Sequence, residues 1–232
     1  MILVMTIAYA RHGFVRQAIE YFQAHTDRSE YTRHVIVDPG YPIPGNAHHI
    51  GQIAAKHDLE YLAIENLGCH QNWNYVLNHY NLGEGDILVG VCPDTRGENP
   101  GWVKASVDVL RADSDCFTVQ LNRHEDYSKI QKDVRVVGGH EVIHFDQLVA
   151  WSCGSFNCGI IKSIGGFGAY NEQYGYGEQW LVDKLPEKRW YFLKNHFDNC
   201  VGSPDVPYTL WKIQSAGQVT KLPFDQWLRV QG

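Results

Sequence analysis

The N-terminal part of the chain alternates between continuous apolar runs and segments in which apolar residues recur at helical spacing. The opening run ILVMTIAY is apolar and rich in β-branched residues, which predicts a buried strand. After the turn RHGF, the apolar positions 15, 18, 19 and 22 of VRQAIEYFQAH recur as they do in a helix. The next run, HVIVD, ends at Asp38 and meets a Pro/Gly turn, which predicts a second strand.

The same alternation continues along the following segments. IGQIAAKH and NWNYVLNHYNL have the spacing of helices, and the short apolar stretch LEYLAI lies between them. GEGD marks a turn, ILVGV predicts a strand and GWVKASVDVLRA predicts the helix that follows it. Strands that alternate with helices of this length predict an α/β fold with a mostly parallel sheet and helices on both faces.

The pattern changes between about residues 114 and 160, where the segments are shorter. CFTVQLN, DVRVVGG, HEVIHFDQLVAW and FNCGII predict strands and loops of a smaller mixed region. The segment IKSIGGFGAYNEQYGYGEQWLVDKL is dense in Gly and Tyr before it becomes helical at EQWLVDKL, and WYFLKNHF predicts a late strand. No linker or repeat interrupts the chain, so we expect residues 1–232 to form a single domain.

Composition and charge narrow the classes of function. A formal net charge of −6 and a pI of about 6.0 give no general attraction to nucleic acid or to anionic membranes. No apolar run approaches the roughly 18 to 20 residues that span a bilayer. The start MILVMTIAYARHGF has neither a basic leader nor a small-residue cleavage site, so we expect a cytoplasmic protein.

The six cysteines are scattered without a CxxC pair, which favours free buried thiols over disulfides. Cys153 and Cys158, together with 12 histidines, raise the alternative of a structural zinc site. The second half of a ligand pair is missing, which argues against that alternative.

Two acidic residues follow predicted strands, where open α/β sheets bind their ligands. Asp38 ends HVIVD, and Asp94 follows ILVGVCPD. Such an acid can accept hydrogen bonds from a base or a ribose, and beside a diphosphate it can hold Mg²⁺ or Mn²⁺. The alternative is that Asp38 begins a Pro-Gly turn and that Asp94 caps a loop.

The order of these segments resembles that of the nucleotide-sugar-dependent glycosyltransferases of family 2, which have the GT-A fold. VIVDPGYP is similar to the acidic turn that holds the nucleoside in that family, with Asp38 at the acidic position. ENLGCHQNWNYVLNHYNLGEGDILVGVCPDTRGENPGWV is similar to the family's asparagine segment, helix, turn, strand and DXD-like metal motif. Asp94 matches the last acid of that motif, and Cys92 stands where its first acid usually lies.

The resemblance implies transfer of a sugar from a nucleoside diphosphate, with a uridine diphosphate sugar as the first expectation, and the help of Mn²⁺ or Mg²⁺. It implies a nucleotide-binding half at about residues 1–95, an acceptor half at about 96–200 and a tail at 201–232 that matches nothing. The residues expected to bind the nucleotide are Ala8, Tyr9, Asp38, Asn66 and Asp94.

A second group of residues resembles the acceptor half of the family. IKSIGGFGAYNEQYGYGEQW is similar to its Gly-Gly-Phe segment and to the Tyr-Gly-Glu-Asp motif that follows, with Glu178 at the Glu and Gln179 in place of the Asp. Glu178 is therefore the candidate general base for an inverting transfer. The alternative is that Glu178 only complements the dipole of a helix.

The late segment RWYFLKNHFDNCVGSPD is similar to the part of some GT-A enzymes that supplies a further metal ligand. His196 is the matching residue, and an imidazole ligand would favour manganese over magnesium. The alternative is that His196 is an ordinary surface or core histidine. Among the aromatic residues, Trp151 and Tyr176 are the candidates for contacts with an acceptor sugar.

A rival motif remains. HEVIH at 140–144 fits HExxH, in which two histidines one helical turn apart bind zinc, with Glu172 or Glu178 as a third ligand. The preceding Gly-Gly and the strand-forming Val142 and Ile143 speak against a helix there. A third class is a GT-A domain that only binds a nucleotide or a glycan, which Cys92 and Gln179 suggest. The acceptor of an enzyme is open: a glycan or a small molecule is the first expectation, and a modified nucleic-acid base is a further one.

Overall fold

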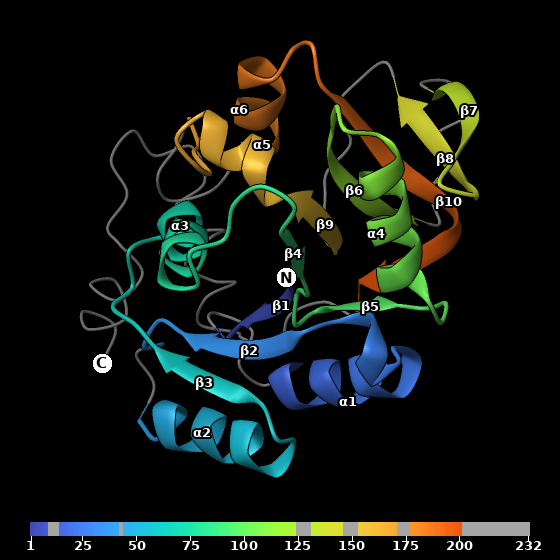
Figure 1. Cartoon of the computed structure of the whole chain (residues 1–232). Coiled ribbons are helices and arrows are strands. Elements are labelled where there is room, and N and C mark those ends of the chain that lie inside the picture. The colour runs from blue at the N-terminus through green and yellow to red at the C-terminus, as the bar shows by residue number, and fades with distance from the viewer. Residues whose placement is uncertain (9–13, 42–43, 124–130, 146–152, 171–176, 201–232) are drawn as a thin grey trace, which may run out of the picture.

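The computed structural model describes residues 1–8, 14–41, 44–123, 131–145, 153–170 and 177–200 (Figure 1). Predictions that fall on the other residues, including the tail at 201–232, lie outside the described residues. The described helices are α1 (Val15–His25), the 3-10 helix η2 (Arg28–Glu30), α2 (Asn46–Lys56), α3 (Cys69–His79), α4 (Trp102–Ala112), α5 (Cys158–Ser163) and α6 (Gly177–Lys184). The described strands are β1 (Ile2–Ile7), β2 (Arg33–Asp38), β3 (Glu60–Ala63), β4 (Ile87–Gly90), β5 (Thr95–Gly97), β6 (Cys116–Arg123), β7 (Gln131–Val137), β8 (His140–Phe145), β9 (Gly154–Asn157) and β10 (Arg189–Cys200).

The strands form one sheet in the order β3-β2-β1-β4-β9-β6-β10-β8-β7, with β5 paired to β10. The strands β3, β2, β1 and β4 are parallel to one another, and β9 is antiparallel to both β4 and β6. Beyond β6, the strand β10 is parallel to β6, whereas β8 and β7 add antiparallel pairs. The predicted fold class, an α/β domain with a mostly parallel sheet and a smaller mixed region, is confirmed.

Both faces of the parallel strands are covered by helices, which explains why these strands are apolar along their whole length. Leu3 and Met5 pack in one cluster with residues of α3, α5 and α6. Val4 points to the opposite face and packs in a second cluster with α1 and α4, and Ile36 packs in a third with α1 and α2. Figure 1 shows α1 and α2 on one side of β2 and β3 and α3 on the other.

The predicted helices and long strands occur where the apolar spacing placed them, and two short elements differ from the prediction. The segment FNCGII does not continue as a strand, because the Asn157 side chain accepts hydrogen bonds from the backbone N–H groups of Gly159 and Ile160 and so caps α5. The strand β5 has only three residues and pairs with β10, about a hundred positions later in the chain. Such a long-range pairing leaves no local pattern in the sequence.

Across the helices that the structure describes, none combines the length and the apolar character needed to cross a membrane.

A buried histidine on β2 ties the stability of the core to pH. His34 is 4% exposed, and its Nε2 lies 3.1 Å from the Thr6 hydroxyl. The Phe22 ring packs against its imidazole with ring centroids 5.1 Å apart. Burial, with a smaller contribution from the charge of Arg28, lowers the pKa of His34 to about 3. The imidazole therefore stays neutral in the folded protein at pH values where a free histidine is charged.

We predict that His34 makes the folded state less stable as the pH falls below about 6.5. The unfolded chain takes up a proton near that pH, whereas the folded chain takes it up only near pH 3, so acid favours unfolding. This residue should reduce the free energy of unfolding by about 1.4 kcal/mol per pH unit in that window. Urea unfolding between pH 7 and pH 4 measures the effect. His34→Gln should flatten the pH dependence, and His48→Gln, which changes an exposed histidine of α2, should not. Equal slopes for the three proteins would contradict the prediction.

Candidate functional site

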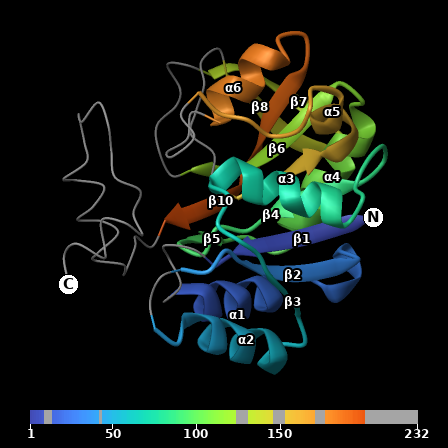
Figure 2. The same ribbon diagram turned by 90° about the vertical axis from the view of Figure 1, so that its left-hand side faces the viewer.

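The carboxyl ends of β1, β2 and β4 lie side by side at one edge of the sheet. The backbone N–H of Ala8 donates to the carbonyl of Val37 at 2.8 Å, and the N–H of Val91 donates to the carbonyl of Met5 at 2.9 Å. The connection from β1 to β2 passes through α1 on one face of the sheet. The connection from β3 to β4 passes through α3 on the other face. Ligands of open α/β sheets bind where the connections diverge in this way. Figure 2 shows β1 and β10 running in the same direction, so the carboxyl end of β10 lies on this side as well.

Asp38 ends β2 at this edge and is 2% exposed. Its carboxylate accepts hydrogen bonds from the Tyr61 hydroxyl at 2.9 Å, from the Gly40 N–H at 3.0 Å and from the Asn46 side chain at 3.4 Å. Burial, together with this hydrogen bond and the charge of Asp38, raises the pKa of Tyr61 to about 12. These hydrogen bonds stabilise the turn after β2. A carboxylate has about four acceptor positions, so the Asp38 carboxylate can accept one more hydrogen bond.

Asp94 lies in the tight turn between β4 and β5 and is buried. The turn is closed by a hydrogen bond from the Thr95 N–H to the Cys92 carbonyl at 3.1 Å. Arg96 follows on β5, and its Nη1 donates to the carbonyl oxygens of Pro93 and of Thr95. Burial lowers the pKa of this guanidinium, and the nearby Cys153 and Asp94 oppose that effect. The turn therefore holds a buried carboxylate and a buried guanidinium two residues apart.

Two further residues reach this turn from distant parts of the sequence. Because β9 runs antiparallel to β4, Cys153 lies beside Cys92. The backbone N–H of Cys92 donates to Sγ of Cys153 at 3.4 Å. The side-chain hydrogen bond to Cys92, burial and the charge of Asp198 all raise the pKa of the Cys153 thiol. Asp198 is buried and lies opposite Gly97 in the pairing of β10 with β5. Asp198 and Arg96 were not predicted as site residues, although Asp198 is also an acid near the end of an apolar strand.

The donor set at this turn fits a divalent cation only in part. Among the residues that the structure describes, no group of three or more His, Cys, Asp or Glu side chains could hold a metal ion. Asp94 provides one carboxylate, and Cys92 replaces the acid that the resemblance would place beside it. Mg²⁺ and Mn²⁺ in phosphate-binding sites are often held by one or two carboxylates plus the phosphate oxygens of the substrate. The residues therefore fit a cation that is shared with a diphosphate.

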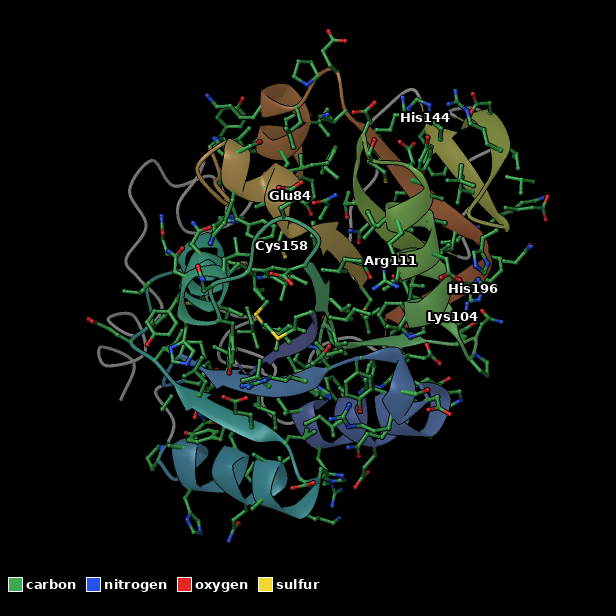
Figure 3. All side chains as sticks on the ribbon, in the orientation of Figure 1. Glu84, Lys104, Arg111, His144, Cys158 and His196 are labelled. Carbon is green, nitrogen blue, oxygen red and sulfur yellow. The ribbon has the colours of Figure 1, made fainter. Side chains whose placement is uncertain are left out.

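His196 belongs to a different group of neighbours. Burial lowers its pKa, and so does the nearby His140 of β8. His140 lies 3.2 Å from the carboxylate of Asp108 on α4, which also pairs with Lys104 at 2.6 Å. Figure 3 labels His196 on β10 and Lys104 on α4. These contacts group His196 with α4 and β8, and its pairing with Asp94 on one metal ion stays a prediction.

Glu178 lies in the first turn of α6, next to α3. Its charge acts on His70 of α3. Burial lowers the pKa of His70, and the negative charge of Glu178 opposes this effect only in part. His70 also packs against Gly177, since a Cβ atom at this position would lie 2.4 Å from Cε1 of the imidazole. Gln179, in place of the second acid of the motif, donates to Asp183 at 2.6 Å and so is engaged within α6.

The Gly-Gly-Phe segment is fastened to α3 by one side chain. Asn74 donates to the carbonyl of Phe167 and accepts from its N–H, both at 2.7 Å. Gly166 has a φ of +105°, and a Cβ atom there would lie 2.4 Å from the Asn74 side-chain oxygen. Only glycine fits this backbone and this contact. The α3 helix therefore contacts both the Gly-Gly-Phe segment and the start of α6.

The remaining predicted residues divide into two groups. Asn66 is exposed in the connection between β3 and α3, and its side chain accepts from the Gly68 N–H at 3.1 Å, as a turn residue does. Tyr9, Trp151 and Tyr176 lie outside the described residues.

The HEVIH segment is a strand and not a helix, because it forms β8 in antiparallel pairing with β7. At about 3.3 Å per residue, His140 and His144 are about 13 Å apart along a strand, too far for one zinc ion. Glu141 is bound by Lys194 at 2.8 Å and by Asn195 at 3.0 Å. The zinc hydrolase interpretation of this motif is therefore wrong.

This sheet, with its acidic turns at the carboxyl ends of β2 and β4, has the GT-A fold of nucleotide-sugar glycosyltransferases, as the sequence predicted. Among solved structures it is similar to the mannosyltransferase PcManGT of Pyrobaculum calidifontis in complex with GDP-Man and Mn²⁺, with a TM-score of 0.64 and 15% identity over 99% of this chain and 68% of that one. It is similar to GalNAc-T7 with UDP, GalNAc and Mn²⁺, with a TM-score of 0.67 and 8% identity over 92% of this chain and 47% of that one. It is also similar to S. aureus TarS 1-349 in complex with UDP-GlcNAc, with a TM-score of 0.58 and 13% identity over 91% of this chain and 64% of that one.

This chain thus spans from about half to about two thirds of these proteins. No protein-family model matches the sequence, and the comparison with curated proteins finds no significant match. At such low identities the structural likeness establishes the fold alone.

We predict that Asp38→Ala weakens the binding of a nucleoside diphosphate at least tenfold, since a hydrogen bond to a charged group contributes about 1.5 to 3 kcal/mol. Calorimetry with UDP and with GDP measures the affinity. Glu187→Ala, which removes an exposed acid between α6 and β10, is the control and should bind as the wild type does. A folded Asp38→Ala protein with unchanged affinity would remove Asp38 from the site.

Proposed function

We propose that the protein is a glycosyltransferase that moves a sugar from a nucleoside diphosphate sugar to a hydroxyl group of an acceptor. The observation that carries this proposal is the placement of Asp38 and Asp94 at the ends of β2 and β4, on either side of β1, in a sheet with the GT-A fold. A uridine diphosphate sugar is the first candidate for the donor, and a guanosine diphosphate sugar is the second. The nucleotides in the structural neighbours, UDP and GDP-Man, support both candidates.

The first half of the chain, about residues 1–95, would bind the donor. The base and the ribose would lie near Ala8, Tyr9 and Asp38, with Asn66 at the side of the connection after β3. The diphosphate would lie at the Asp94 turn. A divalent cation held there by Asp94, with His196 as a further candidate ligand, would neutralise negative charge on the leaving diphosphate. The Mn²⁺ in two neighbouring structures supports this part of the proposal.

The second half, about residues 96–200, would bind the acceptor, with Trp151 and Tyr176 as contacts to its sugar or ring. Glu178 would take the proton of the acceptor hydroxyl while that oxygen forms its bond to the anomeric carbon. The bond from this carbon to the diphosphate breaks in the same step, and the nucleoside diphosphate leaves with the electron pair. Such a displacement inverts the configuration at the anomeric carbon. A glycan or a small molecule is the first candidate acceptor, and a modified nucleic-acid base is a further one. The proposed location is the cytoplasm, an expectation that rests on the sequence.

A domain that only binds a nucleotide or a glycan is the second candidate function. The observations that favour it are Cys92 in place of an acid and the engagement of Gln179 by Asp183. Slow release of a nucleoside diphosphate from a nucleotide sugar in the absence of an acceptor separates the two, because only an enzyme hydrolyses its donor. A panel of UDP and GDP sugars, each with and without Mn²⁺, is the first experiment.

We predict that donor turnover requires a divalent cation and Asp94. Excess chelator should abolish turnover, added Mn²⁺ should restore it, and Asp94→Asn should reduce it at least tenfold by weakening the charge that holds the cation. Glu84→Gln, which changes an exposed acid in the turn before β4, is the matched control and should stay active (Figure 3). Full turnover in excess chelator would show that side chains of the protein stabilise the leaving group without a metal ion.

We predict that Glu178→Gln binds the donor normally and transfers roughly 100-fold more slowly or worse, the usual range for loss of a general base. Glu141→Gln, the same one-atom change at the acid of β8, should be nearly silent. Calorimetry gives the donor affinity and single-turnover kinetics give the rate. If Glu178→Gln transfers at the wild-type rate, Glu178 is a helix-capping residue and another group accepts the proton.

A further inference from the structure

Arg96 is a buried positive charge that has no ion-pair partner among the residues that the structure describes. The residue is 7% exposed, and its Nη1 donates hydrogen bonds to the carbonyl oxygens of Pro93 and Thr95 in its own turn. Its Nη2 is enclosed by the protein and makes no hydrogen bond, and no carboxylate in the described part of the chain forms an ion pair with it. Asp94 is near enough for its charge to act on the guanidinium.

An arrangement of this kind is costly in a purely structural role. Charged side chains are rarely this buried unless they are paired. A lysine could lose its proton in such surroundings, but a guanidinium keeps its charge at all physiological pH values. A structural arginine at this position would be expected to have a carboxylate on its free side. Nη2 instead lacks an acceptor, so an anion that enters this turn would supply one.

The position of the guanidinium agrees with an anion. Its central carbon lies 5.8 Å from the centre of the Phe14 ring, and Phe14 is the residue that precedes the first turn of α1. Phe14 provides no side-chain cap, and the first turn of α1 contains no acidic residue. The positive end of the helix dipole and the guanidinium therefore lie at the same edge of the sheet, beside the carboxyl ends of β1 and β4.

We propose that Arg96 binds the diphosphate of the donor, an inference that rests on the proposed function. The two carbonyl groups fix the plane of the guanidinium, and Nη2 donates to a phosphate oxygen. The arrangement also accounts for Cys92. The turn has one carboxylate fewer with which to hold a cation, and Arg96 supplies a positive charge that needs no metal ion. The ligand class is a diphosphate, either free or as part of a nucleotide.

The experiment is calorimetry with inorganic pyrophosphate, UDP and uridine, each in excess chelator and each in Mn²⁺. The variants are Arg96→Gln and Arg96→Lys, and the matched control is Arg111→Gln, which removes the same charge from the exposed last turn of α4 (Figure 3). In chelator, Arg96→Gln should bind pyrophosphate and UDP roughly 10- to 100-fold more weakly than the wild type, as expected for the loss of a charged hydrogen bond. Its affinity for uridine should stay within about twofold, and Arg111→Gln should match the wild type for all three ligands.

Equal affinities of Arg96→Gln and Arg111→Gln for pyrophosphate, or an equal loss for uridine and UDP, would overturn the inference. A wild-type protein that binds no pyrophosphate in chelator would also overturn the inference. If that protein still binds UDP and uridine, the donor site of the proposed function is retained. Pyrophosphate binding that depends on Arg96 without any binding of uridine would instead support the anion site and count against the nucleotide donor. If circular dichroism shows that Arg96→Gln does not fold, Arg96→Lys decides the matter. It keeps the charge but not the planar fork, and wild-type affinity for pyrophosphate in that variant would overturn the assigned hydrogen bond.

Discussion

The in-register parallel pairing of β1 with β2 on one side and with β4 on the other is the constraint on which the candidate site depends. Ile7 lies opposite Val37 of β2, and Met5 lies opposite Gly90 of β4. The residues that follow these strands therefore emerge at the same edge, although they are far apart in the sequence. A shift of one residue in either pairing would exchange the two faces of the strand and separate the acids from the crevice. Helices on both faces hold this register in place.

The buried polar residues at this edge differ in how many of their hydrogen-bonding groups have a partner in the protein. Asp38 is buried, but it accepts hydrogen bonds from a tyrosine, an asparagine and a backbone N–H, so its burial is compensated. Arg96 is equally enclosed, yet one of its nitrogens has no acceptor within the described ranges. Proteins depart from the pairing of buried charges mainly at functional sites. The contrast separates a residue whose hydrogen bonds support the local fold from one that still has a donor without an acceptor.

The two halves of the chain are joined through β9 and α3. Because β9 is antiparallel to β4 and to β6, the sheet continues without a break into the mixed region and brings Cys153 beside Cys92. On the face of α3, Asn74 fastens the Gly-Gly-Phe segment, while His70 meets the start of α6. The Glu178 region is thus fixed to the helix that leads into β4. A substrate between the two halves would be held by elements that share one core.

The sequence alone determined the helices, the long strands and the α/β class, because the spacing of apolar residues is a local property of the chain. It also predicted the positions of Asp38 and Asp94, since acids that follow apolar strands lie at the carboxyl edge of a parallel sheet, and the structure places both there. Valine and isoleucine within HEVIH indicated a strand, which the pairing of β8 with β7 confirmed. The tertiary structure decided which distant residues approach the Asp94 turn: Cys153 through the pairing of β9 with β4, and Asp198 through the pairing of β10 with β5. It also placed His196 beside α4. These neighbours come from strand pairings between segments about 60 to 100 positions apart, and such pairings are decided by how the whole core packs, so they leave no periodic signal in the sequence.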